Sequence, residues 1–385
     1  MSKKNDKKKK KNKDQKAQES KLNANRTWLT PKIIRWGIVT FLSILIVFIS
    51  LFWMPADLNY EITERYTFTP DEAGEVTLIV LLPTNGDYQE VFEPEVTWPG
   101  SWGSQPEGRL NRLNFSHDFE SEEQFTAEIT YRVHLWQGVA RWRGQPVSPE
   151  DLAPTELILS DHPEIIAQAQ QLEVSGNEVR TARKIFRFTS QHLRWPQGDR
   201  LDVDLDALTA LQSGVGGCSE HAALMVALSR AVNIPAKMVN GLALPETIPG
   251  IPQKETWNHP AGAHAWVEIF VDHTWQLADP SWAKPFFVRN LFGWTDGKHL
   301  VYDEMCVESE VYQALVSEAE ENGTWIAAMS APLRFVAWSD ISVDGMVLIP
   351  EVTLLKVWDT RYLFMFSTIL ILVILTWITG NRKRT

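Results

Sequence analysis

Residues 214–241 read GVGGCSEHAALMVALSRAVNIPAKMVNG, and they determine how the middle of the chain folds. The glycines at the start of this stretch allow a sharp bend in the backbone. A helix is expected from Ser219 to Val232 because apolar residues recur on one face, and Cys218 lies directly at its start. The next segment, IPAKMVNGLAL, reads as a strand. The stretch therefore predicts a turn, a helix and a strand in succession.

The start of a helix is a favourable place for a nucleophilic cysteine. The amides and dipole of a helix N-terminus stabilise the thiolate, which is the reactive form of the side chain, and the same amides can stabilise an oxyanion. Two other interpretations of Cys218 stay open: a small apolar residue that packs at a helix end, or one half of a disulfide with Cys306. Because the chain has two cysteines, neither a multi-disulfide scaffold nor a Cys-rich zinc module is expected.

A second motif follows in residues 264–282, HAWVEIFVDHTWQLADPSW. We expect a β-hairpin with its turn at Asp272 and His273. His264 opens the first strand and Asp279 closes the second, so the two side chains should lie side by side. Taken singly, a strand histidine is more often structural, and an aspartate before proline is often a turn former. Together with the cysteine, however, they supply a triad in which the carboxylate orients the imidazole.

These three motifs, in this order, resemble the transglutaminase-like superfamily and its papain-like core. Members carry a glycine turn with a catalytic cysteine at a helix start, then Gly-Ile-Pro-Ala-Arg, a His-Ala-Trp-Val-Glu strand, and Asp-Pro at the end of the next strand. The resemblance covers residues 175–283. It implies that Cys218 is the nucleophile, His264 the general base and acid, and Asp279 the orienting carboxylate.

The sequence departs from the family pattern at two positions, where Asn233 and Lys237 replace Gly and Arg. These changes affect a turn and one charge and leave the triad intact. The motifs do not identify the second oxyanion donor. Gln191 and Trp195 are candidates because they lie near the end of the preceding helix, where the family often carries an aromatic residue. Gln212 is a third candidate, because papain-like enzymes hold an oxyanion glutamine six residues before the nucleophile, as here.

The sequence predicts no cofactor and no metal ion. Three alternating aspartates resemble a calcium loop but lack the glycine and terminal glutamate of an EF-hand, which favours solvated carboxylates before a helix: Asp202, Asp204 and Asp206. Cys218, His221 and His264 could be read as metal ligands, but Cys-x-x-His alone is a weak zinc signal. We expect His221 to line the pocket or pack beside it. Four tryptophans are expected to form core and cleft walls: Trp257, Trp266, Trp275 and Trp282.

Charge is distributed very unevenly along the 385 residues. Residues 1–35 hold 13 Lys/Arg and 3 Asp/Glu, and residues 381–385 add three positive charges. The segment between them holds 21 Lys/Arg against 45 Asp/Glu, a net charge of −24. A strongly acidic body is not typical of a nucleic-acid-binding protein. A hydrophobic content of 44% excludes a disordered chain.

Two uncharged apolar stretches, Trp36–Met54 and Tyr362–Gly380, separate the basic ends from the acidic body. A helix of this length rises about 28 Å, which matches the core of a bilayer. The basic flanks predict that both termini are cytoplasmic and that residues 55–361 are extracytoplasmic. A cleaved signal peptide is an alternative for the first stretch, although no clear A-x-A-like site follows Phe52.

The expected fold class is α+β: a transglutaminase-like, papain-like core preceded by a small β-sandwich-like domain and flanked by two transmembrane helices. The β-rich domain is inferred from short strands separated by turn signals. The predicted divisions are a basic tail, a membrane helix, the β-rich domain, the catalytic core, a C-terminal extension, a second membrane helix and a short tail: 1–35, 36–54, 55–147, 148–285, 286–361, 362–380 and 381–385.

The predicted chemistry is acyl transfer at an amide through a cysteine thioester. With water as the acceptor, the enzyme is a cysteine peptidase or amidase; with an amine, it is a protein cross-linking transglutaminase. A non-catalytic envelope binding or assembly module is the competing class, and an intact triad argues against it. The expected partners are a protein or peptide substrate in the cell envelope and the lipid membrane, without nucleic acid. The sequence does not indicate an oligomeric state.

Overall fold

The computed structural model describes most of the chain between residues 31 and 381: residues 31–70, 73–107, 110–120, 123–143, 146–196, 206–244, 249–256, 263–283, 291–303, 317, 325–328, 342–343 and 346–381. Two compact units divide the chain. The first comprises Met1–Leu51 with Arg361–Thr385, and the second comprises Phe52–Thr360. Each unit is described by itself.

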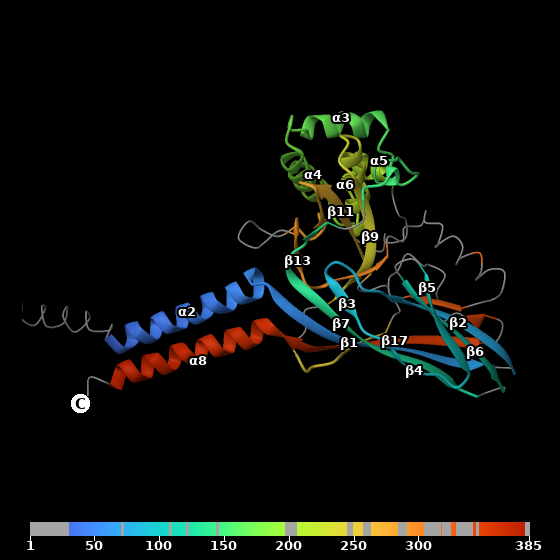
Figure 1. The fold of residues 1–385 in the computed structure, drawn as a ribbon, viewed down its shortest axis with the longest axis horizontal. Coiled ribbons are helices and arrows are strands. Elements are labelled where there is room, and N and C mark those ends of the chain that lie inside the picture. Colours follow the sequence, from blue (N-terminus) through green and yellow to red (C-terminus); the bar gives the residue numbers. More distant parts are fainter. Residues whose placement is uncertain are drawn as a thin grey trace, which may run out of the picture. The chain divides into compact units, whose positions relative to one another are not determined.

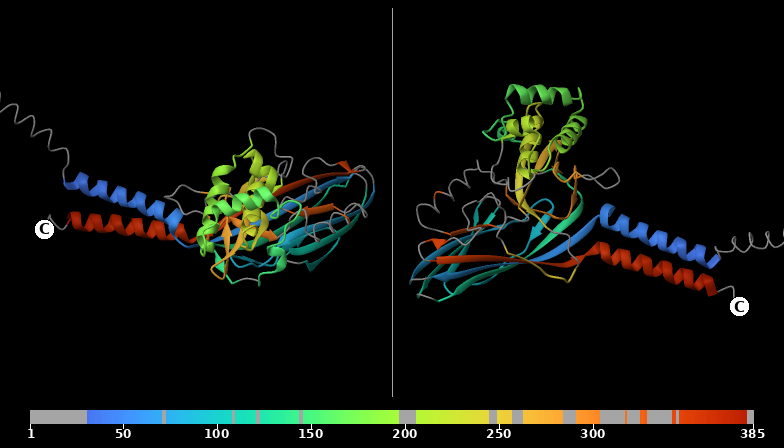
Figure 2. Two further views of the ribbon diagram at one scale, coloured as in Figure 1. Left: turned by 90° about the horizontal axis from the view of Figure 1, so that it is seen from above. Right: turned by 180° about the vertical axis from the view of Figure 1, so that it is seen from behind.

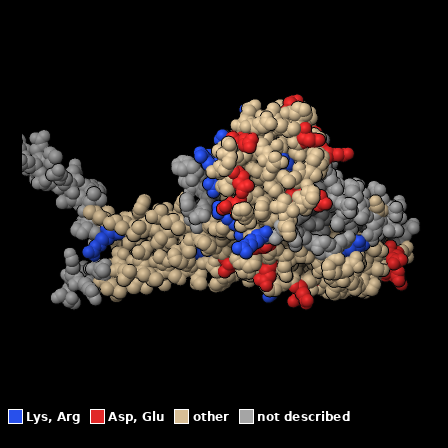
Figure 3. All heavy atoms as spheres, turned by 45° about the horizontal axis from the view of Figure 1, so that its top comes forward, with Lys and Arg blue, Asp and Glu red and all other residues tan. Residues whose placement is uncertain are grey.

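The first unit contains two long apolar helices, α2 (Pro31–Trp53) and α8 (Thr360–Asn381). They run alongside each other in all three ribbon views (Figures 1 and 2). Both are long and apolar enough to cross a membrane, and only 11% of each apolar window is buried. Their surface is almost wholly free of charge, whereas acidic side chains are spread over the face of the second unit seen in Figure 3. The two predicted apolar stretches therefore correspond to two candidate membrane helices.

The second unit begins with a β-sandwich whose larger sheet has the order β10-β17-β1-β7-β13. Its long strand β1 (Ala56–Pro70) alternates buried and exposed side chains, as a strand with one face in a core must. The chain returns beside it as β17 (Met346–Asp359), antiparallel to β1. The remaining members are short apart from β7: β3 (Gln89–Val91), β4 (Glu95–Thr97), β7 (Phe125–Val139), β10 (Gln253–Thr256), β13 (Trp294–Asp296) and β16 (Ser342–Val343).

The smaller sheet has the order β15-β2-β6-β5, and it packs on the larger one. Its strands are β2 (Gly74–Pro83), β5 (Ser101–Glu107), β6 (Leu110–Phe119) and β15 (Trp325–Ala328). Strands from residues 56–139 form most of this sandwich, and strands from residues 253–359 complete it. This long-range completion had no signal in the sequence, because pairing between distant strands leaves no local pattern.

The core that follows the sandwich gathers helices on one side of a five-stranded sheet (Figure 1). The helices are α3 (Pro163–Leu172), α4 (Glu178–His192), α5 (Ala207–Ser213) and α6 (Cys218–Arg230), after a short 3-10 turn, η1 (Pro149–Asp151). The sheet order is β14-β9-β11-β12-β8. Its strands are β8 (Arg141–Trp142), β9 (Ala236–Ala243), β11 (Ala263–Val271), β12 (Thr274–Ala278) and β14 (His299–Asp303). Ten consecutive residues of α6 are buried, which makes it the central helix of the core.

A buried polar cluster links the sandwich to the core sheet. Glu64 of β1 accepts hydrogen bonds from the hydroxyls of Tyr66 and Tyr131. The Tyr131 hydroxyl also lies 2.8 Å from that of Tyr302, on β14. Burial raises the pKa of Glu64 to about 7, and the two tyrosine hydrogen bonds lower it by less.

Candidate active site

Cys218 is the first residue of α6, and the turn before it requires glycine. The Gly217 amide donates to Glu220 Oε2 at 2.5 Å, which caps the helix. A Cβ atom at Gly216 would lie 2.4 Å from Cβ of Glu220, so only glycine fits there. Cys218 is half-buried and is a free cysteine in the structure. Cys306, the other half of the alternative disulfide, lies outside the described residues.

His264 lies on β11 directly opposite Gly241 of β9. A Cβ atom at Gly241 would be 2.0 Å from the Leu300 carbonyl oxygen and 2.7 Å from the Trp266 ring, so glycine lets the strands close around this position. The side chain of His264 is 4% exposed, and the ring of Trp282 lies against it with centroids 4.6 Å apart. The backbone therefore fixes the histidine, and the aromatic ring shields it from water.

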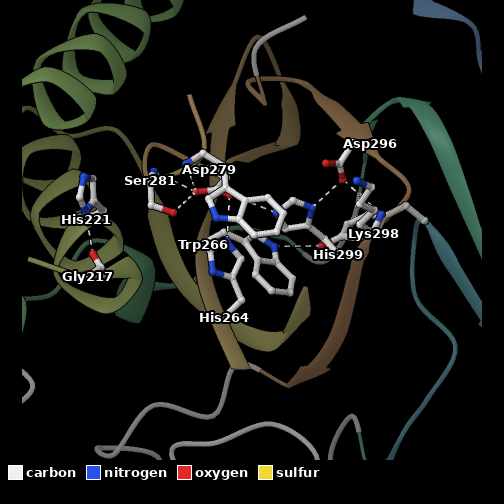
Figure 4. Close-up of polar contacts among 11 residues, drawn as sticks. Gly217, His221, His264, Trp266, Asp279, Ser281, Asp296, Lys298 and His299 are labelled. Atoms are coloured by element: carbon white, nitrogen blue, oxygen red, sulfur yellow. Dashed lines mark hydrogen bonds and ion pairs between the residues drawn. The ribbon is translucent and has the colours of Figure 1, made fainter. Parts of the chain in front are cut away.

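Asp279 directly follows β12, and its carboxylate is completely buried. Oδ2 accepts from His264 Nε2 at 2.9 Å (Figure 4). Oδ1 accepts from the amide and hydroxyl of Ser281, at 2.9 and 2.7 Å, and from the amide of Trp282 at 3.2 Å. The Asp-Pro turn thus serves two purposes: it ends the strand and holds the carboxylate with its own backbone.

The ionisation of this group of residues is strongly shifted. Burial lowers the pKa of His264, but hydrogen bonds to Asp279 and to Cys218 outweigh it and raise that pKa to about 10. Burial raises the pKa of Asp279, but the hydrogen bond from His264 and a second from His299 hold it well below its usual range. Because Nε2 of His264 is hydrogen-bonded to Asp279, Nδ1 is the ring nitrogen that contacts Cys218. At neutral pH the imidazole is therefore cationic, and it lies between the Asp279 carboxylate and the Cys218 side chain.

A second histidine reaches the same carboxylate. Nε2 of His299, on β14, lies 3.2 Å from Asp279 Oδ2, and its Nδ1 lies 3.1 Å from Asp296 Oδ1 (Figure 4). Burial lowers the pKa of His299, and the hydrogen bonds to the two carboxylates raise it above its ordinary value overall. The sequence motifs do not identify this residue. Its only signal was a polar Asp296-Gly297-Lys298 turn beside a histidine in a segment after the triad.

The structure brings one of the three oxyanion candidates to the start of α6. Trp195 is 48% exposed, and its ring would lie 3.6 Å from a Cβ atom at Gly217. Gln191 is exposed on α4. The side-chain amide of Gln212 is directed to α3, where it lies 3.2 Å from both carboxylate oxygens of Glu164. Among these three, Trp195 is the residue placed beside the turn that precedes Cys218.

His221 packs beside the site, where the sequence analysis expected it. Its Nδ1 lies 2.6 Å from the Gly217 carbonyl oxygen, and its ring stacks with that of Trp195 at 6.2 Å. Burial lowers the pKa of His221, and the Gly217 hydrogen bond offsets part of that shift. Within the described residues, the set with metal-ligand spacing is instead His264, Asp279 and His299, whose nearest atoms lie within 4.8 Å. Those atoms already form the hydrogen bonds given above.

The remaining sequence features have simple structural roles. Asp206 caps α5 through the amide and hydroxyl of Thr209, at 2.8 and 2.9 Å, whereas Asp202 and Asp204 lie outside the described residues. Asn233 has a φ of +58°, the left-handed region in which the family carries glycine. Lys237 makes an ion pair of 3.5 Å with the buried Glu268. Its ammonium also lies 4.9 Å from the Trp275 ring centroid.

The four tryptophans divide between the core and the surroundings of the site. Trp266 is buried and donates to the Tyr88 hydroxyl at 3.2 Å. Trp275 is also buried, and Trp282 contacts His264 as described. Trp257 lies outside the described residues.

Residues 166–280 match the family model described as the transglutaminase-like superfamily. This part of the chain is therefore a transglutaminase-like core, and the family predicted from the three motifs is confirmed. The match spans less than a third of the chain and includes Cys218, His264 and Asp279. No curated protein matches the sequence.

Three solved structures are similar to this chain. A candidate cysteine protease from Cytophaga hutchinsonii is 14% identical, with a TM-score of 0.43 over 67% of this chain and 86% of its own. The periplasmic domain of TgpA from Pseudomonas aeruginosa bound to ethylmercury is 18% identical, with a TM-score of 0.31 over 62% and 94%. A candidate protease from Parabacteroides distasonis is 15% identical, with a TM-score of 0.25 over 59% and 43%. Similarity at this level does not assign an activity.

Proposed function

We propose that this protein is a membrane-anchored cysteine enzyme that cleaves or transfers acyl groups at protein or peptide amides, with hydrolysis as its main reaction. The observation that supports this proposal is the chain of contacts from Cys218 through His264 to the buried Asp279. A free thiol at a helix N-terminus, a cationic imidazole beside it and a carboxylate with no exposure to water are the parts of a nucleophilic triad.

The reaction divides into two steps. The Cys218 thiolate adds to the amide carbonyl carbon, and Nδ1 of His264 gives its proton to the leaving nitrogen as the C–N bond breaks, which leaves a thioester on Cys218. Neutral His264 then takes a proton from water as the water oxygen attacks the thioester carbonyl and the C–S bond breaks, so the acid is released and the thiolate–imidazolium pair is restored. Asp279 keeps the imidazole in one tautomer and orientation through both steps. Amides at the start of α6 stabilise the oxyanion.

The acyl acceptor distinguishes hydrolysis from transamidation. The test uses the full chain in detergent micelles, a glutamine-containing peptide with a fluorogenic amide, and the same peptide with added fluorescent primary amine. We expect amide release in both reactions and little amine incorporation. Cys218→Ala should abolish release, and Ser219→Ala, the neighbouring residue, is the matched control. Incorporation of the amine at the rate of release would replace hydrolysis by cross-linking as the main reaction.

Alkylation of Cys218, which needs no substrate, distinguishes an enzyme from a non-catalytic module. Iodoacetamide at about pH 6 should alkylate Cys218 much faster than free glutathione, since a thiolate paired with an imidazolium persists at acidic pH. Alkylation at the glutathione rate would remove the activated nucleophile and favour a binding role.

The proposed location follows from the two candidate membrane helices and the charge on either side of them. Both termini are cytoplasmic and the catalytic unit is extracytoplasmic in this proposal. Protease added to intact cells should digest Phe52–Thr360 and leave the lysine-rich residues 1–35 intact. Protection of the catalytic unit would reverse the orientation.

A further inference from the structure

The carboxylate of Asp279 is shared between two buried histidines, and a triad needs only one. His264 and His299 both direct Nε2 to the same oxygen, Oδ2, at 2.9 and 3.2 Å. The ring of His299 is completely buried, and its other nitrogen lies 3.1 Å from Asp296 Oδ1. Two anionic acceptors, one on each ring nitrogen, require both nitrogens to carry a proton. His299 is therefore an imidazolium held between two carboxylates.

The geometry gives this second imidazolium two effects on the first. It restricts rotation of the Asp279 carboxylate, because Oδ1 is tied to the Ser281–Trp282 turn and Oδ2 is held from two sides. It also adds a second positive charge beside the buried Asp279 carboxylate, which stabilises the anionic form of that carboxylate.

Asp296 extends the same arrangement to the edge of the site. It lies on β13, its side chain is 21% exposed, and its Oδ1 also accepts from the Lys298 amide at 3.2 Å. The turn is tight, since Gly297 has a φ of +71° and a Cβ atom there would be 2.8 Å from Leu58. Asp296 and His299 are thus set at a fixed separation by the backbone that joins the two sheets.

We propose that His299, anchored by Asp296, is a positioning residue that fixes the Asp279 carboxylate against His264 and so holds the His264 imidazolium beside Cys218. This rests on the proposed function, since it assigns His299 to the same site. Within the part of the chain that the structure describes, the titratable groups that face His299 are Asp279, Asp296 and the ring of His264, whose centroid lies 5.5 Å away. The Trp266 and Trp282 rings cover the remaining sides.

Two variants of the full-length protein test the proposal, each compared with the wild type for kcat, KM and the rate of iodoacetamide alkylation as a function of pH. His299→Leu removes both hydrogen bonds and the positive charge. We expect kcat to fall about 10-fold, equivalent to about 1.4 kcal/mol, with KM changed by less than about 2-fold. The acid limb of the alkylation profile should move to higher pH. Asp296→Asn, which leaves the imidazole in place but weakens its anchor, should lower kcat by less than His299→Leu does.

His192→Gln is the matched control, because His192 is a histidine of the same core that bonds the Leu211 carbonyl at 2.6 Å and has no contact with the triad. It should leave kcat and the alkylation profile unchanged. Thermal unfolding identifies a variant that has lost its fold; if His299→Leu does so, Asp296→Asn decides. Folded variants with wild-type kcat and a wild-type alkylation profile would overturn the proposal. Alkylation needs no acyl donor, so it tests the positioning role even if wild-type protein cleaves no amide.

Discussion

The Glu64→Gln variant should be more stable than the wild type at high pH. At low pH, it should be equally stable or less stable than the wild type. Glu64 is completely buried and accepts from Tyr66 and Tyr131, and burial is the largest cause of its raised pKa. Glutamine has nearly the same size and never ionises. Its amide can donate to the Tyr131 hydroxyl, whose own proton can turn to Tyr302, so the cluster keeps its hydrogen bonds.

The size of the effect follows from proton linkage. The pKa of Glu64 is about 7 in the folded protein against 4.5 for the ordinary group. Between these values the folded state binds a proton that the unfolded state has released, so this contribution to stability is present below about pH 4.5 and is lost as pH rises through 7. Between about pH 5 and pH 8 the loss is on the order of 2–3 kcal/mol for the wild type and zero for the variant.

Urea denaturation of the full chain in micelles, followed by tryptophan fluorescence, measures this difference. The stability of Glu64→Gln minus that of the wild type should rise by the same 2–3 kcal/mol, on the order of magnitude given by linkage, from about pH 5 to pH 8. Glu128→Gln is the control. Glu128 lies on β7, in the same sheet, and pairs with the exposed side chain of Arg65, so this variant removes a carboxylate from the surface. A difference that stays constant with pH would refute the conclusion that Glu64 is protonated in the fold.

Three further predictions concern the site and its frame. Asp279→Asn should lower kcat by about 10²–10⁴-fold in the amide-release assay, because an amide cannot hold His264 in the required tautomer; activity near that of the wild type would contradict the triad. Because the pKa of His264 is raised to about 10, the imidazolium that protonates the leaving nitrogen is present below that pH and lost above it, so the alkaline limb of kcat should lie near pH 10; a limb near 6.5 would show an unperturbed histidine. Gly241→Ala should lower stability by about 1–3 kcal/mol in thermal unfolding because its Cβ has no space. Gly103→Ala, with nothing within 4 Å, should have a small effect, and equal losses for the two would argue against the steric cause.

The part of the site that could be predicted from the sequence is the part built from local elements. Cys218 follows a glycine turn at a helix start, and a strand, turn and strand bring His264 and Asp279 to the same place, so short-range rules are sufficient. The pairing of β11 with β12 has the predicted turn at Asp272 and His273, both of which have positive φ. The family match at residues 166–280 includes these same motifs.

The parts that could not be predicted depend on contacts between distant strands. His299 reaches Asp279 because β14 pairs with β9 on the far side of β11, an arrangement that no spacing in the sequence encodes. Gln212 has the spacing of an oxyanion donor, but Gly214 ends α5 in the left-handed conformation, and the side chain of Gln212 lies against Glu164 of α3. The number of residues between Gln212 and Cys218 therefore does not determine the direction in which the Gln212 side chain points.

The pairing of β1 with β17 also has a mechanical consequence. The chain enters the second unit through β1 and leaves it through β17, and the two strands are aligned from Leu58 opposite Asp359 onward. A force that pulled the two ends of this unit apart would break the hydrogen bonds between β1 and β17 one after another. This geometry resists mechanical force weakly. At the loaded end, the fully buried Lys356 lies 3.7 Å from Asp359 and 5.4 Å from the ring of Tyr60. The contacts among these three side chains must break before the two strands can separate. The hydrogen bonds between β1 and β17 beyond them therefore stay intact until those contacts are lost.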